Sequence, residues 1–115
     1  MQPEANFRNR VHRRLKKIDL YHHVHVQSME AGNGTPDYYY EAKGTVLWVE
    51  YKVHPNKCSP KQERWIARTR KNGHRAWVAS WNPKKMTVSV EMNPGEVKEM
   101  ELPTYVDVLY GAVVQ

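Results

Sequence analysis

Residues 45–53 form the segment that most restricts the fold of this 115-residue chain. They read Thr-Val-Leu-Trp-Val-Glu-Tyr-Lys-Val and lie between Gly44 and Pro55. Such a run of β-branched and aromatic residues, bounded by turn-forming residues, predicts a β-strand. Both of its faces are apolar apart from Glu50 and Lys52, so we expect it inside a sheet. These two side chains share one face, and burying them is costly unless they are paired or bind an ion.

A second acidic residue precedes this strand. Residues 37–42 are expected to fold back on the strand through a tight turn, which would bring Asp37 next to Glu50. Two carboxylates can hold a hard divalent cation, which activates water and neutralises charge on a phosphate. A lysine beside them can orient that water or stabilise negative charge. We therefore predict phosphodiester hydrolysis by Asp37, Glu50 and Lys52; the alternative is a structural ion pair between Glu50 and Lys52.

Positive charge is concentrated in residues 1–90, which hold seventeen lysines and arginines against seven acidic residues. Residues 91–115 hold one basic and five acidic residues. A basic surface favours a polyanion, because each neutralised phosphate releases counterions. The alternative is an ordinary solvated surface. The residues predicted to contact nucleic acid come from two basic segments: Arg8, Arg13, Lys57, Lys61, Arg64, Arg68 and Lys71.

Two helices are predicted on either side of the acidic residues. From Pro3 to Lys17, apolar residues recur every three or four positions, which is the helical spacing. The second helix should begin at Ser59 as its N-cap, with a proline at the first helical position and Gln62 completing a capping box. Asn72-Gly73 should end it.

The remaining segments predict further strands. Residues 20–27 favour a short strand, and residues 75–81 a buried strand parallel to 45–53 across a strand–helix–strand crossover. Residues 86–92 alternate in polarity as a strand does. The apolar stretch 102–114 is interpreted as a helix or a pairing segment.

Pro36-Asp37 followed by Glu50-Tyr51-Lys52 resembles the signature of the PD-(D/E)xK nuclease superfamily. Residues 59–65, Ser-Pro-Lys-Gln-Glu-Arg-Trp, followed by Asn72-Gly73 and an apolar strand, are similar to its VRR-NUC branch, which includes small stand-alone nucleases of phages and bacteria. The resemblance covers about residues 4–81. It implies an α/β, restriction-endonuclease-like core, with a mixed central β-sheet flanked by helices.

The resemblance also implies a set of site residues. Asp37, Glu50 and the backbone carbonyl of Tyr51 would bind one or two Mg²⁺ ions, for which Mn²⁺ can substitute. Lys52 would act as the catalytic base or stabilise charge. Two further catalytic residues are implied, one at the start of each predicted helix: Glu4 and Gln62. Serving only the helix cap is the alternative for the glutamine.

The length predicts a single nuclease domain over residues 1–115. No run of eighteen apolar residues is present, so no membrane span is expected. No apolar segment follows the N-terminus, so we expect no secretory signal and a cytoplasmic location in a bacterium or a phage-infected cell. The single cysteine, Cys58, excludes an internal disulfide and fits a reducing interior.

These observations predict a Mg²⁺-dependent, structure-selective DNA endonuclease. Members of the resembling family favour branched DNA such as four-way junctions. A pair of cuts needs two active sites and hence a homodimer, with the apolar segment 102–114 expected at the interface. The alternative for that segment is a helix folded onto its own sheet. The alternative functions are a nicking, restriction-like or repair nuclease on duplex or flap DNA, and a non-catalytic nucleic-acid-binding protein.

Overall fold

The computed structural model describes residues 3–17, 25–28, 38–42 and 45–114. Within these residues, six strands form one sheet in the order β1-β2-β3-β4-β5-β6. β3 and β4 are parallel and the other neighbours are antiparallel, so the sheet is mixed. The elements are α1 (Pro3–Lys17), β1 (His25–Ser28), β2 (Tyr38–Ala42), β3 (Thr45–Val53), α2 (Pro60–Lys71), β4 (Arg75–Asn82), β5 (Thr87–Asn93), β6 (Glu96–Met100) and α3 (Leu102–Val114).

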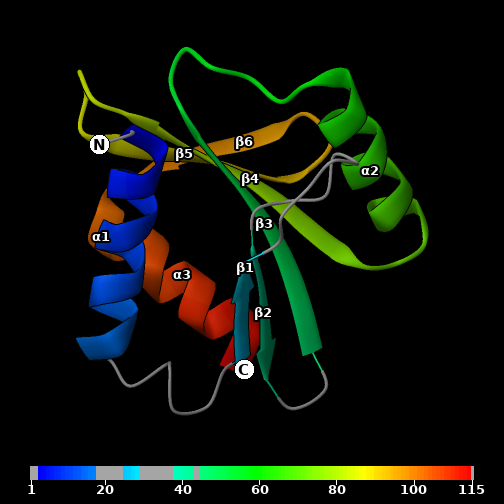
Figure 1. Cartoon of the computed structure of the whole chain (residues 1–115), viewed down its shortest axis with the longest axis horizontal. Coiled ribbons are helices and arrows are strands. Elements are labelled where there is room, and N and C mark those ends of the chain that lie inside the picture. The colour runs from blue at the N-terminus through cyan, green and yellow to red at the C-terminus, as the bar shows by residue number, and fades with distance from the viewer. Residues whose placement is uncertain (1–2, 18–24, 29–37, 43–44, 115) are drawn as a thin grey trace.

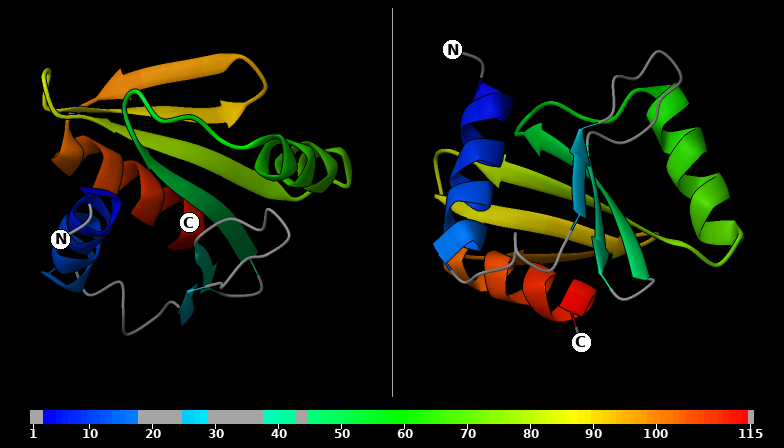
Figure 2. Two further views of the ribbon diagram at one scale, coloured as in Figure 1. Left: turned by 45° about the horizontal axis from the view of Figure 1, so that its top comes forward. Right: turned by 60° about the horizontal axis from the view of Figure 1, so that its bottom comes forward.

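The helices lie on both faces of the sheet (Figures 1 and 2). α1 and α3 lie beside each other on one face, whereas α2 covers part of the opposite face. Phe7 of α1 and Tyr105 of α3 both contact the ring of Tyr51, which places the main core between these helices and the sheet. The predicted fold class is confirmed: the protein is α/β, with a mixed central sheet flanked by helices.

β3 has the predicted bounds and lies in the middle of the sheet. Leu47, Val49 and Tyr51 are fully buried on the α1 and α3 face. The opposite face of the same strand carries Trp48, Glu50 and Lys52, and α2 contacts this face through Trp65 and Gln62. The alternation of the strand therefore separates its packing residues from its charged ones.

The connection from β3 to β4 is the predicted crossover. Ser59 caps α2, and its side chain accepts a hydrogen bond from the Gln62 N–H. Pro60 occupies the first helical turn, as expected for a residue without an N–H to donate. Arg75 then aligns with Leu47 at the start of the parallel pairing. This short crossover places the beginning of α2 beside the second half of β3.

The C-terminal part of the chain differs from expectation in two ways. β6 was not predicted, because Glu-Val-Lys-Glu-Met is mostly charged; it forms an exposed strand at the sheet edge, antiparallel to β5. The segment 102–114 is a helix on its own sheet, and Tyr105, Val106 and Leu109 are fully buried in the core of the same chain. The structure therefore shows the alternative arrangement, a helix folded onto its own sheet. The buried apolar side of this helix is not available to a partner chain.

Other boundaries agree closely. α1 has the predicted bounds, and β4 and β5 end one residue beyond the predicted strands. Of the strand expected over residues 20–27, the structure describes only the part from His25, which belongs to β1. None of the helices in the described part of the chain is long and apolar enough to span a membrane.

Candidate active site

Glu50 is the most deeply buried charged residue among those that the structure describes. Only 1% of its surface is exposed, and it lies on the α2 side of β3. Its Oε2 atom lies 3.3 Å from Nζ of Lys52, two residues further along the same strand. The lysine side chain is 13% exposed, so the pair has an inner carboxylate and an outer ammonium group. Desolvating a carboxylate is costly, and this arrangement offsets the cost with an opposite charge.

Gln62 connects this carboxylate to α2. Its Nε2 donates a hydrogen bond of 3.2 Å to Oε2 of Glu50. Its Oε1 accepts a hydrogen bond of 2.8 Å from the Ser59 N–H, which completes the capping box. One amide thus contacts both the helix cap and the buried carboxylate, so capping is not its only contact. The helix cap fixes the position of the donor that reaches the carboxylate.

Two of the acidic residues predicted for the site are not placed by the structure. Asp37 lies outside the described residues. Tyr38, the next residue in the chain, pairs with Val49, which directly precedes Glu50. Glu4 belongs to the first turn of α1, but its side chain also lies outside what the structure describes.

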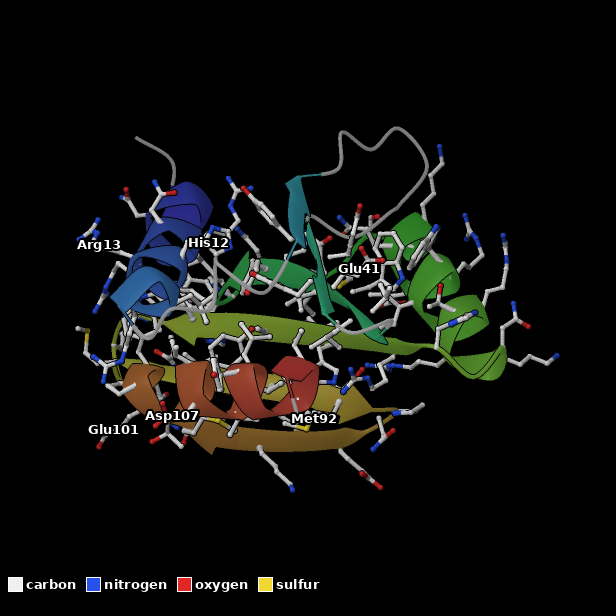
Figure 3. All side chains as sticks on the ribbon, turned by 90° about the horizontal axis from the view of Figure 1, so that it is seen from below. His12, Arg13, Glu41, Met92, Glu101 and Asp107 are labelled. Atoms are coloured by element: carbon white, nitrogen blue, oxygen red, sulfur yellow. The ribbon has the colours of Figure 1, made fainter. Side chains whose placement is uncertain are left out.

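The Tyr51 side chain points away from the charged pair, into the core between the sheet and the helices α1 and α3. Its hydroxyl lies 2.7 Å from that of Tyr40 and accepts a hydrogen bond of 3.1 Å from that of Tyr105. Tyr40 in turn contacts Nε2 of His12 at 2.8 Å, and Figure 3 shows this histidine on the side of α1 that faces β1 and β2. Burial raises the pKa of both Tyr51 and Tyr105. Only the main-chain carbonyl of Tyr51 is a candidate ligand.

Cys58 lies half-buried just before the N-cap of α2. Burial, and then the negative charge of Glu50, raise the pKa of its thiol to about 11, although Lys52 acts in the opposite direction. A thiol is a poor nucleophile when it stays protonated. The cysteine is therefore a structural neighbour of the charged pair and not an activated group.

The basic residues divide into exposed and structural ones. Arg70 donates to the Ala76 carbonyl and forms an ion pair of 2.9 Å with Glu91, and Arg75 donates to the Ala112 carbonyl. Arg8 is half-buried, with its guanidinium over the ring of Tyr38. The other residues predicted to contact nucleic acid are exposed: Arg13, Lys57, Lys61, Arg64, Arg68 and Lys71.

All of these exposed cations except Lys57, which precedes α2, lie on the helices α1 and α2. Arg13 lies on the outer side of α1 (Figure 3). Lys61, Arg64, Arg68 and Lys71 follow α2 at three- and four-residue steps, which aligns them along one side of that helix. The α2 surface is the nearer one to Glu50, because Gln62 of the same helix contacts it.

Sequence reasoning missed the neighbours of the charged pair on the sheet. Lys52 aligns with Ser80 of β4, which aligns with Ser89 of β5, and these residues share the face of Glu50. A serine in the middle of the apolar run 75–82 was the available signal. Trp48 and Trp65 also lie on this side of the sheet, where their rings meet at a centroid distance of 5.0 Å.

The charged pair and its neighbours offer oxygen atoms that could bind a metal ion. Among the described residues, no group of three histidine, cysteine or acidic side chains is close enough to hold an ion. The buried Glu50 offers a carboxylate group, and the Tyr51 carbonyl belongs to the next residue of the strand. Hard oxygen donors of this kind are the ligands that Mg²⁺ and Mn²⁺ prefer.

Comparisons with known proteins found similarity among solved structures. A search of protein-family models found no match, and no curated protein matched by sequence. Among solved structures, the chain is similar to Hjc of Archaeoglobus fulgidus, a Holliday junction resolvase from an archaeal hyperthermophile. The identity is 17% and the TM-score 0.45, over 84% of this chain and 91% of that one.

Proposed function

We propose that this protein is a metal-dependent nuclease that hydrolyses phosphodiester bonds in DNA. The observation that carries the proposal is the Glu50 carboxylate, 1% exposed, with Lys52 and Gln62 both on its Oε2 atom. Burying a carboxylate–lysine pair costs desolvation free energy, and such pairs are concentrated in active sites. The resemblance of Pro36-Asp37 and Glu50-Tyr51-Lys52 to the PD-(D/E)xK signature gives the pair its chemistry.

In this proposal a divalent ion, Mg²⁺ with Mn²⁺ as a substitute, binds Glu50, the Tyr51 carbonyl and Asp37. Asp37 is included because it is bonded to Tyr38, whose partner Val49 directly precedes Glu50. When bound, the ion supplies a Lewis acid that lowers the pKa of a water molecule and neutralises phosphate charge. Glu4 is retained as an accessory carboxylate from the first turn of α1.

The residues of the chain have distinct tasks in this mechanism. Lys52 is the more exposed member of the pair, so its ammonium group can contact the scissile phosphate or the attacking water. Gln62 holds the Glu50 carboxylate in one orientation through the capped end of α2. The exposed cations of α2 bind phosphates on either side of the cut without reading the bases.

Branched DNA is the substrate that we propose, with four-way junctions as the leading case. The VRR-NUC resemblance supports this choice, and no base-reading motif is recognised in the sequence. Paired cuts across a junction need two sites, so we infer that a homodimer is the active form. The side of α3 that is buried in the core of its own chain cannot form its interface.

The test of the nuclease is cleavage of a labelled four-way junction, with its component duplex as the comparison, in Mg²⁺ and in EDTA. Glu50→Gln and Asp37→Asn should each abolish cleavage under single-turnover conditions while DNA binding is kept or strengthened. Each change removes negative charge from the metal site and leaves the basic surface intact. Asp107→Asn, at an exposed position of α3, is the matched control because it makes the same acid-to-amide change away from the site. Cleavage by either acidic-site variant at the wild-type rate would contradict the metal-site assignment.

The homodimer is tested separately, by light scattering at micromolar concentration. We expect the mass of two chains, with and without junction DNA. A monomeric mass combined with full junction cleavage would contradict the paired-cut mechanism. It would leave nicking, restriction-like or repair cleavage of duplex or flap DNA as the function of the same site.

A second candidate is a nucleic-acid-binding protein without catalysis. It is favoured by the charge pairing within the site, because the 3.3 Å contact of Glu50 with Lys52 is also what a structural ion pair gives. The two candidates share the basic surface of α2 and differ in metal dependence. Binding of DNA with no cleavage in Mg²⁺ or Mn²⁺ would establish the second candidate over the first.

A further inference from the structure

A small cavity lies on the side of α2, lined by Lys61, Arg64, Trp65 and Arg68. Its volume is about 230 Å³. Lys61 precedes Arg64 and Trp65 by three and four positions, and Arg68 follows them by four and three, so the four residues share one side of the helix. Three of these residues are cations, and the indole ring of Trp65 is the apolar surface of the cavity. Figure 3 shows the nitrogen-tipped side chains of α2 extending away from the sheet.

The indole of Trp65 is held in place by a second aromatic residue. It meets Trp48 of β3 at a centroid distance of 5.0 Å and an interplanar angle of 69°. Trp48 in turn contacts Tyr39 of β2 at 5.0 Å. A perpendicular contact uses the edge of one ring and a face of the other, so it fixes the pair and leaves other ring faces for a further partner. Trp65 is half-buried, at the boundary between this aromatic cluster and the cations.

This cavity has a fixed position relative to the charged pair. Trp48 and Glu50 are alternate residues of β3, about 7 Å apart at the backbone. Trp65 lies three residues after Gln62, which donates to Glu50. Lys52 lies two residues further along β3, so about 13 Å of strand separates it from Trp48. That span corresponds to about four stacked nucleotide steps along one DNA strand. A phosphate at Lys52 would therefore place a base a few nucleotides along the same strand within reach of Trp65.

We propose that the Trp65 cavity binds an unpaired nucleobase that lies a few nucleotides from the scissile phosphate on the same DNA strand. The base stacks on Trp65, and Lys61, Arg64 and Arg68 hold its flanking phosphates. A base inside a duplex is already stacked on both faces, whereas a base at a branch point, a flap or a bulge can enter a pocket. The proposal rests on the nuclease function for its biological use, and it names DNA with an unpaired nucleotide near the cut as the substrate class.

The test uses binding in EDTA, so that it does not depend on cleavage. The affinity of the chain for a single strand of thymidines is compared with that for an abasic strand of equal length and charge. We expect the strand with bases to bind about tenfold more tightly, since stacking of one base on an aromatic ring has an effect of this size. A 2-aminopurine base in the strand should lose fluorescence on binding, which reports stacking directly.

The variants separate stacking from charge. Trp65→Leu keeps an apolar contact with Trp48 and should remove the preference for strands with bases, while Trp65→Phe should restore most of it. Lys61→Gln should weaken binding of both strands equally. Unfolding midpoints of the variants check that α2 remains folded, and the 2-aminopurine signal of the wild-type chain needs no variant.

Equal affinity of the wild-type chain for the two strands would overturn the proposal and leave a phosphate-binding surface only. A preference that persists in Trp65→Leu would also overturn it, because the base would then bind elsewhere. Absence of cleavage in Mg²⁺ with the preference intact would contradict the nuclease and not the base pocket.

Discussion

At the scale of single residues, Glu50 is notable because it is a charged group buried in the sheet. Its burial costs the hydration of the carboxylate. The sheet desolvates it, and the fold places Lys52 and Gln62 on one of its oxygens. If either partner is removed, the desolvation of the buried carboxylate is less well offset. The resulting loss of stability exceeds the net stabilisation that the contact provides. The geometry of the site therefore depends on three side chains from two elements.

The dual contact of Gln62 can be separated by a pair of substitutions. Gln62→Glu retains an oxygen for the Ser59 N–H, since Glu also completes a capping box, but it removes the donor to Glu50 and adds a like charge. We expect cleavage to fall at least about tenfold, because hydrogen bonds to charged groups are stronger than neutral ones. Ser59→Ala should instead lower the unfolding free energy by about 1 kcal/mol and leave the cleavage rate unchanged.

Single-turnover rates and chemical denaturation measure the two effects. A rate for Gln62→Glu equal to that of the wild-type chain, with stability also unchanged, would show that the contact with Glu50 has no part in catalysis.

At the scale of the elements, α2 combines three functions along its faces. Its first turn holds Glu50 through Gln62, its inner side packs Ile66 against the sheet, and its outer side carries the exposed cations. Because the cap fixes the beginning of the helix, the cations keep a constant distance from the charged pair. Arg70 belongs to the inner group, since its ion pair with Glu91 ties α2 to β5.

Neutralising the outer cations of α2 should weaken DNA binding uniformly. Arg64→Gln, Arg68→Gln and Lys71→Gln should each lower affinity about equally for all sequences and reduce the salt dependence by about one phosphate contact, because phosphate contacts carry no base information. Lys98→Gln on β6 is the control with the same charge change on another element. Titrations at several salt concentrations measure this, and a loss confined to certain sequences would contradict the phosphate-contact assignment.

At the scale of the whole molecule, a buried tyrosine network joins β2, β3 and α3. The hydroxyls of Tyr40, Tyr51 and Tyr105 form a continuous chain of hydrogen bonds inside the core. Burial raises the pKa of Tyr51 and Tyr105 above the ordinary value for tyrosine. The folded state therefore keeps their protons at a pH where the unfolded chain releases them.

This linkage predicts loss of stability in alkali. The contribution of both tyrosines is fully present below about pH 10, the ordinary tyrosine pKa, and is lost as the pH rises above it. Tyr105→Phe should lower the unfolding free energy at neutral pH by about 1 kcal/mol, through its lost hydrogen bond, yet make it fall less steeply above pH 10. Denaturant unfolding across pH 7 to about 11 measures both.

Val113→Ala is the matched control on the same helix, because Val113 is buried and carries no ionisable group. It should lower stability by a similar amount at every pH. An identical alkaline slope for the wild-type chain and Tyr105→Phe would contradict the role assigned to the buried hydroxyls.

Local sequence patterns were sufficient to predict the elements with strong periodicity or with clear capping and turn residues at their ends. β3 followed from β-branched and aromatic residues between Gly44 and Pro55, and the start of α2 from Ser59, Pro60 and Gln62. These signals act within a few residues, through side-chain alternation and backbone hydrogen bonds, so they need no knowledge of distant contacts. The pairing of Glu50 with Lys52 followed from the same alternation.

The tertiary structure alone decided which groups meet across the chain. Whether residues 102–114 face a partner or their own sheet depended on the space beside α1, which no local pattern specifies. The strand β6 depends on a partner, β5, because its charged sequence has little strand tendency of its own. The tertiary structure also decided which basic residues are structural. Arg70 forms its ion pair because Glu91 of β5 lies within contact distance of α2. Arg64 and Arg68 lie on the surface beside Trp65.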